Sequence, residues 1–192
     1  MPPKAKFSKE EIIQAALEIV RTDGMAALTA RALGTKLGSS ARPVFTVFQS
    51  MEEVQQAAVK AAKKIYNGYV EKGMEEARAF KGVGTQYILF AIEEPKLFQL
   101  LFMREQENVP HLAVVLPLID ENYQMILSSI EKDYPIGRAA AQRLYHHLWI
   151  YTHGIASLCA TKMCSFTPQE INGMMTEIFV SLLKNIEMER KA

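Results

Sequence analysis

Residues 29–50 read TARALGTKLGSSARPVFTVFQS, and this stretch carries the most specific pattern in the chain. Its first apolar residues share one face at helical spacing: Ala32, Leu33 and Leu37. Gly38 follows where a helix end favours a left-handed backbone, and Ser40 then suits the N-cap of another helix. Pro43 lies in the first turn of that second helix, where its missing N–H costs nothing. The pattern therefore predicts a helix-turn-helix whose second helix starts at Ser40.

The apolar residues of the second helix leave its other side free. Val44, Val47 and Phe48 form a stripe that we expect to face the first helix. The outward or N-terminal positions are then Ala41, Arg42, Phe45 and Thr46. Arginine can form paired hydrogen bonds with guanine or bind a phosphate, and small side chains can touch thymine methyls. The helix starts after Thr29 and Ser40 offer free N–H groups for phosphate oxygens. The alternative is an ordinary helical hairpin, since glycine-turned helix pairs are common.

Residues of the N-terminal quarter resemble the DNA-binding domain of TetR/AcrR-type transcriptional regulators. The similar residues, in chain order, are Ile13, Ala15, Ala16, Leu17, Gly24, Leu28, Thr29, Leu37-Gly38-Ser39-Ser40, Val44-Phe45, Phe48, Ser50 and Glu52-Glu53-Val54. Arg31 matches a position in the second helix where some members place a base-reading arginine. The chain departs at Phe45 and Met51, where the family usually has tyrosine and lysine as phosphate contacts.

The resemblance implies an all-α fold with two domains. Residues 1–50 would form a three-helix DNA-binding domain, and residues 51–192 a larger helical domain for effector binding and dimerisation. Segments 90–102 and 149–154 are similar to a C-terminal domain subtype seen in this family.

The pattern and the resemblance together define a set of expected DNA contacts. These residues are Thr29, Arg31, Lys36, Ser40, Ala41, Arg42, Phe45 and Thr46. We expect Arg31 and Arg42 to read bases, and the hydroxyls with Lys36 to hold phosphates. The arm formed by residues 1–7 would add Lys4 and Lys6 along the backbone, although a basic tail is more often only solvated.

Composition indicates a folded protein with a weakly basic N-terminal end. Of the 192 residues 49% are hydrophobic, enough to bury a core as one unit or two small domains. The formal net charge is only +1. Residues 1–50 hold seven basic and four acidic residues, so this segment carries +3 and the remainder −2. A local DNA footprint fits this distribution, and so does chance.

Several function classes find no support in the sequence. The histidines His111, His146, His147 and His153 form no metal signature, and no phosphate cradle, nucleophile elbow or carboxylate pair is present. Cys159 and Cys164 are five apart and so lie on different faces of a helix, which favours reduced, buried thiols. We therefore expect no metal, no cofactor and no enzymatic activity. With no signal peptide and no membrane-length apolar run, a soluble cytoplasmic protein is expected.

The rest of the chain is predicted to be helical. Capping boxes are expected at Ser8 with Glu11, Ser50 with Glu53, and Thr167 with Glu170. The predicted helices after the first three cover residues 51–72, 82–94, 95–106, 110–132, 136–162 and 168–189.

The last two predicted helices are apolar over more than one face, which requires burial on several sides. They are either central in a monomer or, by analogy with the family, the interface of a two-fold dimer. Such a dimer would place two reading helices about 34–36 Å apart, or a multiple of this.

A ligand site for a small apolar or amphipathic effector is expected in the C-terminal domain. The candidate residues are Phe90, Phe98, Phe102, Met103, Tyr123, Tyr145, His146 and Trp149. The alternative for most of them is a place in the core, where aromatic and methionine side chains at helical spacing usually lie.

Our hypothesis from the sequence is a ligand-responsive, dimeric transcriptional regulator, most simply a repressor, that binds a palindromic double-stranded DNA operator. Two alternatives remain open. One is an all-α enzyme or small-molecule carrier, and the other a protein-interaction module that uses the helix pair as a docking surface.

Overall fold

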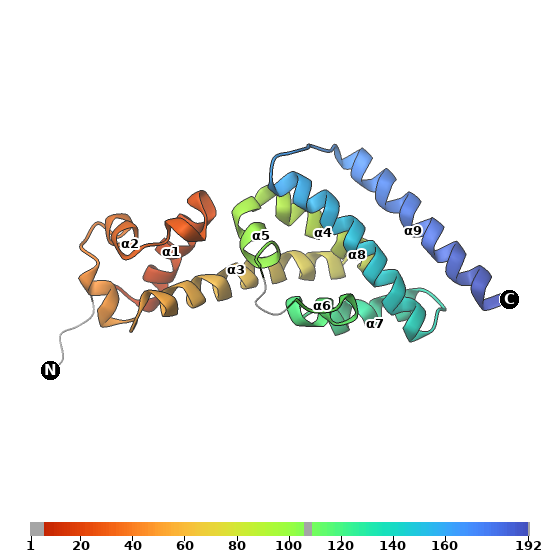
Figure 1. The fold of residues 1–192 in the computed structure, drawn as a ribbon, viewed down its shortest axis with the longest axis horizontal. Coiled ribbons are helices and arrows are strands. Elements are labelled where there is room, and N and C mark those ends of the chain that lie inside the picture. The colour runs from red at the N-terminus through yellow and green to blue at the C-terminus, as the bar shows by residue number, and fades with distance from the viewer. Residues whose placement is uncertain (1–5, 106–108, 192) are drawn as a thin grey trace. The chain divides into compact units, whose positions relative to one another are not determined.

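The computed structural model describes residues 6–105 and 109–191, and within these ranges all regular structure is helical (Figure 1). The elements are α1 (Lys9–Asp23), η1 (Met25–Ala27), α2 (Ala30–Lys36), η2 (Arg42–Thr46), α3 (Met51–Met74), α4 (Ala79–Glu93), α5 (Pro95–Phe102), α6 (Leu112–Ile119), α7 (Tyr123–Asp133), α8 (Arg138–Ala160) and α9 (Pro168–Lys191). The two η elements are short 3-10 helices. The predicted all-α class is confirmed.

Contacts divide the described chain into two units. Unit 1 holds the residues up to Ile65 together with Glu94–Arg104, and unit 2 holds Tyr66–Glu93 and the residues from Glu105 onward. α3 contributes residues to both units. The domain boundary expected between residues 50 and 51 stays a prediction, and the contacts add α5 to the N-terminal helices.

α1 has the start, the stop and the buried face that its sequence predicts. The Glu11 N–H donates to the Ser8 hydroxyl, and the Ser8 N–H donates to the Glu11 carboxylate at 2.7 Å, which forms the expected capping box. The helix ends at Gly24, whose φ of +86° favours glycine. Its buried residues are Ile12, Ala15, Ala16, Leu17, Ile19 and Val20. Unit 1 is built on this face.

The second helix of the predicted helix-turn-helix differs from expectation. It is the five-residue 3-10 helix η2, and its N-cap position is Ala41, with no side-chain cap. The prediction that Ser40 caps this helix is therefore wrong. Pro43 lies in the first turn of η2, and Gly38 has the predicted left-handed backbone with φ +62°. η2 is a 3-10 helix, since its hydrogen bonds join residues three apart. The Val44 N–H donates to the Ala41 carbonyl oxygen, and the Val47 N–H donates to the Val44 carbonyl oxygen.

The contact between α2 and the turn depends on a glycine. A Cβ atom on Gly34 would lie 2.8 Å from the Ala41 nitrogen and 2.9 Å from the Ser40 carbonyl carbon. Both are backbone atoms, so a side chain at this position cannot be accommodated by a rotamer change. The backbone of α2 thus touches the backbone of the turn, and this contact fixes where η2 begins.

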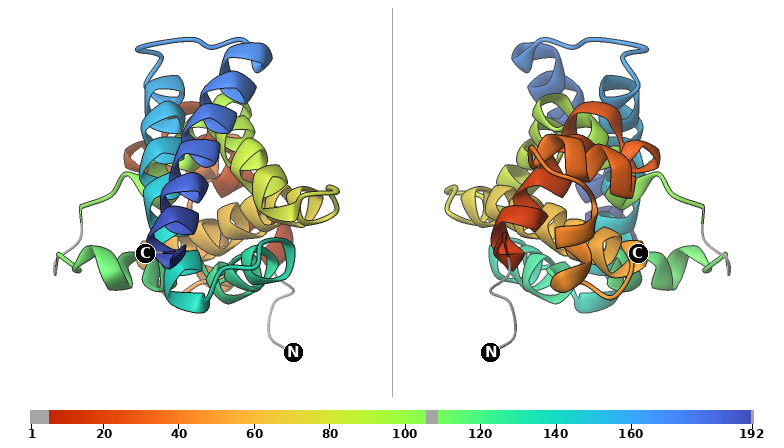
Figure 2. Two further views of the ribbon diagram at one scale, coloured as in Figure 1. Left: turned by 90° about the vertical axis from the view of Figure 1, so that its right-hand side faces the viewer. Right: turned by 90° about the vertical axis from the view of Figure 1, so that its left-hand side faces the viewer.

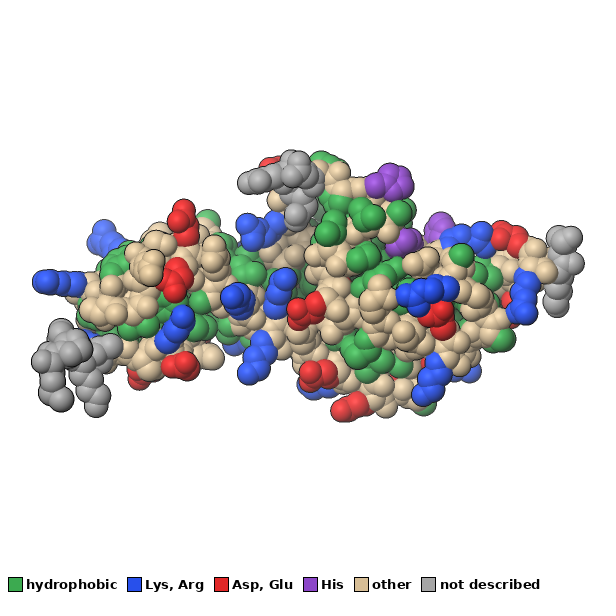
Figure 3. Space-filling view, turned by 90° about the horizontal axis from the view of Figure 1, so that it is seen from below, with side chains coloured by type: hydrophobic (Ala, Val, Ile, Leu, Met, Phe, Trp, Pro, Cys, Tyr) green, Lys and Arg blue, Asp and Glu red, His purple; other side chains and the backbone are tan. Residues whose placement is uncertain are grey.

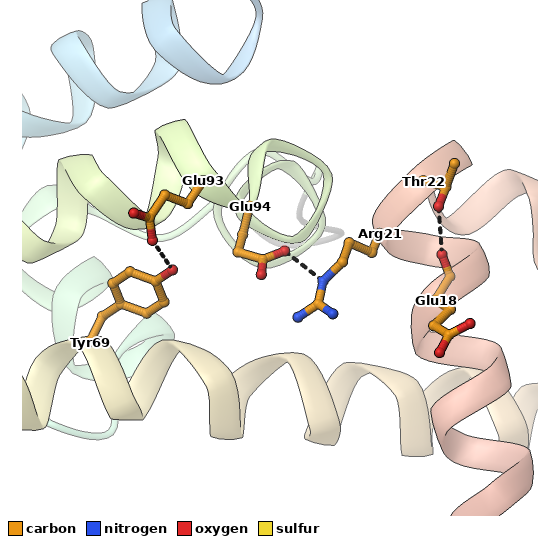
Figure 4. Close-up of polar contacts among 6 residues, drawn as sticks. All are labelled: Glu18, Arg21, Thr22, Tyr69, Glu93 and Glu94. Atoms are coloured by element: carbon orange, nitrogen blue, oxygen red, sulfur yellow. Dashed lines mark hydrogen bonds and ion pairs between the residues drawn. The ribbon is translucent and has the colours of Figure 1, made fainter.

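α5 packs on α1 within unit 1. The Arg21 Nε of α1 lies 2.7 Å from Glu94 Oε2 at the start of α5, and the glutamate side chain is largely shielded from solvent (Figure 4). Leu97 and Phe98 of α5 are fully buried. These contacts explain why α5 groups with the N-terminal helices.

In unit 2, α3 and α4 cross at two glycines. A Cβ atom on Gly73 would lie 2.6 Å from both the Cα and the nitrogen of Val83, and a Cβ on Gly82 would meet the Gly73 carbonyl oxygen. At the other end of α4, the Tyr69 hydroxyl of α3 donates to the Glu93 carboxylate at 2.6 Å (Figure 4). Neither backbone could approach the other this closely with a larger residue.

The predicted helix between residues 110 and 132 is two helices, α6 and α7. The chain leaves α6 at Asp120, whose backbone is extended, and the Asp120 side chain accepts a hydrogen bond from the Asn122 N–H at 2.8 Å. This local hydrogen bond competes with helix continuation and begins α7 instead. The other predicted limits differ at helix ends only: α4 starts earlier than 82, α5 ends before 106, and α8 lies inside 136–162.

α9 returns antiparallel to α8 and packs along it (Figure 2). Its start is the predicted capping box: the Glu170 N–H donates to the Thr167 hydroxyl, and the Thr167 N–H donates to the Glu170 carboxylate. These hydrogen bonds lower the pKa of Glu170. The Ser50 box is only half formed, because the Glu53 carboxylate accepts from the Gln49 N–H rather than from Ser50. None of the helices described here is both long and apolar enough to cross a membrane.

Replacing Gly34 with alanine is expected to lower the free energy of unfolding by about 1–3 kcal/mol, since the new methyl meets backbone atoms that can yield only by moving the turn. Gly68→Ala is the matched control, because nothing lies within 4 Å of a Cβ there. That helical position should gain about 0.5–1 kcal/mol. Urea unfolding of both variants measures the difference, and a G34A protein as stable as the wild type would contradict the close contact.

Candidate nucleic-acid interface and ligand cavity

The α2–turn–η2 segment presents two unpaired arginines. Arg31 of α2 and Arg42 of η2 are exposed, and neither forms a hydrogen bond or ion pair with any other residue of the described chain. Phe45 is 44% exposed beside them, whereas Val44 and Phe48 of the same segment are buried. The inward and outward sides of η2 thus match the predicted stripe, except that Val47 is only half-buried. Both guanidinium groups are available to a partner.

Other predicted DNA contacts are already engaged within unit 1. Lys36 Nζ lies 2.7 Å from Glu18 Oε2 of α1, and the Thr46 hydroxyl donates to the Pro43 carbonyl oxygen at 2.7 Å. The Thr29 hydroxyl caps α2 by accepting from the Ala32 N–H. These three side chains therefore support the segment locally.

The remaining predicted contacts lie around the turn. Ser40 is exposed and Ala41 is half-buried, so both border the same surface as Arg42. Lys6 donates to the Ser39 hydroxyl at 3.0 Å, so the side chain of this one residue contacts the turn. Lys4 lies outside the described residues.

The charge of the whole molecule does not mark an interface. On the face drawn in Figure 3, lysine and arginine side chains are interspersed with acidic ones. Net charge therefore does not indicate a nucleic-acid interface in this protein, and only the local residues of the α2–turn–η2 segment do.

Unit 2 contains a cavity of about 140 Å³ between α3, α4, α8 and α9. It is lined by Tyr66, Arg78, Phe80, Lys81, Val83, Gly84, Tyr87, Asp120, Tyr134, Tyr145, Leu148, Trp149, Thr152, Met175, Thr176, Phe179 and Val180. The walls are mostly apolar and aromatic. Met175 lines it from α9, and its sulfur lies 3.5 Å from the Thr152 hydroxyl.

A buried carboxylate lies in the cavity wall. Asp120 is 7% exposed and accepts three hydrogen bonds, from the Tyr66 hydroxyl at 2.7 Å and from the main-chain and side-chain N–H groups of Asn122. No lysine, arginine or histidine of the described chain forms an ion pair with it. All three donors are neutral, so none of the groups that contact Asp120 compensates the charge of a carboxylate.

The tyrosines around this carboxylate stay protonated. Burial, and then the nearby Asp120 carboxylate, raise the pKa values of Tyr66 and Tyr145 well above the ordinary range. Burial also raises the pKa of Tyr87, against a smaller lowering from its hydrogen bond with Trp149. Because the Trp149 indole can only donate, the Tyr87 oxygen accepts from it and the Tyr87 hydroxyl proton points to His153 Nδ1, 2.9 Å away. Burial lowers the pKa of His153, in agreement with a neutral ring.

Two of the eight predicted ligand residues line the cavity, Tyr145 and Trp149. Tyr123 lies behind Tyr145, with the two rings stacked at 5.4 Å. Phe90 is fully buried in the core of unit 2. His146 is half-buried, burial lowers its pKa, and its Nε2 has no hydrogen-bond partner among the described residues.

The other three predicted ligand residues, Phe98, Phe102 and Met103, belong to unit 1. Phe98 and Phe102 pack against each other at 5.3 Å, and Met103 is exposed. The structure does not bring them to the cavity.

Five further cavity residues were not among the predicted ligand contacts: Tyr66, Tyr87, Asp120, Tyr134 and Phe179. The one local signal was Asp120 itself, an acidic residue that follows the apolar run 112–119 and is therefore placed close to a core. The tyrosines carry no such signal, because a tyrosine at helical spacing looks alike in a core and in a cavity wall.

The cysteines and histidines offer no metal site among the residues that the structure covers. Cys159 is half-buried, and burial raises the pKa of its thiol. Cys164 is exposed and lies beyond the end of α8, so the prediction that both thiols are buried in one helix is wrong for Cys164.

The chain matches no protein-family model, and no curated protein is significantly similar to it.

Replacing Lys36 with glutamine is expected to raise the pKa of Glu18 toward its ordinary value of 4.5. The side-chain hydrogen bond from Lys36, and then its charge, lower that pKa, and Arg21 contributes less. Because the folded-state pKa is lowered, the pair stabilises unit 1 above the pKa of the unfolded chain, and this contribution is lost as pH falls through the folded value. An NMR titration of the side-chain carboxyl groups measures the pKa of Glu18 in both proteins. K60Q is the control, and an unchanged Glu18 pKa in K36Q would contradict the pairing.

Proposed function

We propose that the protein is a DNA-binding transcriptional regulator of the TetR/AcrR type, whose reading element is the α2–turn–η2 segment. One observation carries the proposal: Arg31 and Arg42 are exposed and make no hydrogen bond or ion pair within the described chain, while Val44 of the same segment is buried. A guanidinium group without an intramolecular partner is the side chain best suited to guanine edges and phosphates. In this proposal Ser40, Ala41, Phe45 and Thr46 flank the two arginines at the DNA surface.

The short η2 changes what the segment can do at a groove. Five residues of 3-10 helix present one turn of side chains, fewer than a long reading helix. Base contacts would therefore come from Arg31 and Arg42, and Phe45 would supply an apolar contact in place of the tyrosine hydroxyl usual in the family. Lys36 would reach a phosphate only by giving up its pair with Glu18.

The cavity of unit 2 is the proposed effector site. An effector can shift the protein between two conformations only by binding one of them better, and a hundredfold preference supplies about 2.7 kcal/mol of coupling. α3 is the proposed link, because it includes residues of unit 1 and also Tyr66 of the cavity wall.

Replacing Arg42 with alanine is expected to weaken binding to a selected operator by about 1–3 kcal/mol and to relax the sequence preference, since a paired contact to guanine is lost. The operator is first selected from a random duplex pool with the wild-type protein. Fluorescence polarisation over a salt series then measures affinity, which should fall steeply as salt rises.

Arg104→Ala is the matched control for this experiment, because Arg104 is an exposed arginine of unit 1 outside the reading segment. It should bind DNA as the wild type does. Equal affinities for R42A and R104A would refute the assignment of Arg42. Failure of the wild type to bind any duplex would favour the small-molecule carrier or the protein-interaction module instead.

We further propose that α8 and α9 form the interface of a homodimer. The support is apolar exposure on both helices: Ile150 is 48% exposed, Val180 39% and Met188 61%. Side chains of this size on adjacent helices gain free energy when a second copy covers them.

Replacing Ile150 with glutamate is expected to raise the dimer dissociation constant at least about tenfold, because an unpaired carboxylate would be buried. Val114→Glu, on α6, is the control, since Val114 is 50% exposed in the same unit and outside the proposed interface. Sedimentation at micromolar concentration measures both. A monomeric wild type, or an I150E protein as dimeric as V114E, would remove the proposed interface.

A further inference from the structure

We propose that the cavity of unit 2 binds an organic cation: a protonated amine or ammonium group on a body about the size of one aromatic ring. The inference rests on the proposed function, because it names the ligand class of the site that is assigned there to the effector. Four properties of the cavity support this ligand class: its charge, the Tyr145 hydroxyl, its aromatic walls and its volume.

The charge of the cavity wall selects the sign of the ligand. Asp120 is buried, and no cation of the described chain pairs with it. Its three hydrogen-bond donors, from Tyr66 and Asn122, are neutral. A buried carboxylate held only by neutral donors leaves its charge uncompensated, and a cationic ligand would supply the compensation in a low-dielectric setting. A carboxylate has about four acceptor sites, so one remains for a ligand N–H group.

A second polar group in the wall is free. Tyr145 is 6% exposed and lines the cavity, and its hydroxyl makes no hydrogen bond within the described chain. Its ring is held by stacking on Tyr123 and by an edge contact with Phe80, so the hydroxyl has a fixed position. This hydroxyl is therefore open to a ligand in the cavity, and its oxygen can accept a hydrogen bond from a ligand N–H group.

The aromatic walls favour the same sign. Rings of Tyr66, Tyr87, Tyr145 and Trp149 border the cavity together with Asp120. The faces of aromatic rings attract cations, and the attraction grows when the cation is removed from water. These aromatic side chains and the carboxylate border the same cavity, so an ammonium group bound there would lie close to both.

The volume sets the size of the apolar body. A dry cavity of about 150 Å³ in a protein core holds one benzene molecule, and this cavity measures about 140 Å³. One ring thus fills it, with the short chain that carries the nitrogen lying toward Asp120.

Two basic residues, Arg78 and Lys81, also line the cavity, and they favour the opposite sign. Both are exposed, so water and salt screen their charges. Asp120 is shielded from that screening by its burial. We therefore assign the greater influence on a bound ligand to Asp120, and an anionic probe tests this assignment directly.

The test uses three probes with the same ring and different charge: 2-phenylethylamine, 2-phenylethanol and 3-phenylpropionate. Trp149 is the only tryptophan of the chain and lines the cavity, so its fluorescence reports binding to the full-length protein without DNA. The amine should bind at least about tenfold more tightly than the alcohol, and the propionate should bind weakest. Tighter binding of the propionate, or no binding of the amine at millimolar concentration, would overturn the proposal.

Asp120→Asn removes the charge and keeps the shape. The amide oxygen still accepts from the Asn122 N–H, and the amide NH₂ can donate to the Tyr66 hydroxyl. We expect D120N to lose the preference for the amine and to bind the alcohol as the wild type does, and alcohol binding also reports that the variant is folded. D133N, an exposed aspartate of the same unit outside the cavity wall, should leave all three affinities unchanged. An amine preference retained in folded D120N would overturn the role of Asp120.

If D120N does not fold, the probe series on the wild-type protein still decides the sign of the ligand. The DNA titration is a separate measurement. If the protein binds the amine but no DNA, the proposed regulator function is wrong and the proposed ligand class stands. If it binds DNA but not the amine, only the proposed ligand class is wrong.

Discussion

The backbone contact at Gly34 is the constraint on which the reading segment depends. Because α2 lacks a Cβ at this position, residues 39–41 can lie directly on the helix, with atoms where a methyl group would stand. The position of the turn decides where η2 begins, and this in turn places Val44 inside. When Val44 faces the core of unit 1, Arg42 and Phe45 face solvent. They are three residues apart and so share one face of a 3-10 helix, which differs from the face of Val44. The outward position of Arg42 in the proposed interface is therefore a consequence of a missing side chain at Gly34.

A comparable constraint shapes unit 2, but it is paired with a buried charge. Gly73 and Gly82 let α3 and α4 touch through their backbones. Asp120 ends α6, begins the turn before α7 and also binds the Tyr66 hydroxyl of α3. One carboxylate thus has a structural role at a helix break and also lines the cavity, where we propose that it binds the ligand. The structural role explains its hydrogen bonds, and it leaves the charge itself without compensation.

The features that could be predicted from the sequence are those set by neighbouring residues. The capping boxes at Ser8 and Thr167 and the left-handed Gly38 depend on local hydrogen bonds and φ alone, and all three are confirmed. Ser40 was assigned as an N-cap on the same local grounds. It failed because the contact of the turn with Gly34, which no local pattern reveals, starts η2 one residue later. The cavity could not be predicted either, since Tyr66, Tyr87 and Asp120 come from three separate elements. Aromatic content alone selected Phe98 and Phe102, which lie in the other unit.

α3 is where the two proposed activities would have to meet. Its buried residues Val54, Ala58, Ala62, Tyr66 and Val70 recur every four positions, so one continuous stripe runs through the residues of both units. Tyr66 is the one α3 residue in the described cavity wall, and its hydroxyl is bound to the carboxylate proposed to hold the ligand. In the proposal a cation occupies the acceptor site of Asp120 that remains beside this hydrogen bond, so the ligand and the Tyr66 hydroxyl share one carboxylate. The coupling between ligand binding and DNA binding cannot exceed the difference in ligand affinity between the two conformations of the protein. A ligand that contacted only the exposed residues Arg78 and Lys81 would touch neither Asp120 nor Tyr66. We expect such a ligand to leave α3 unchanged.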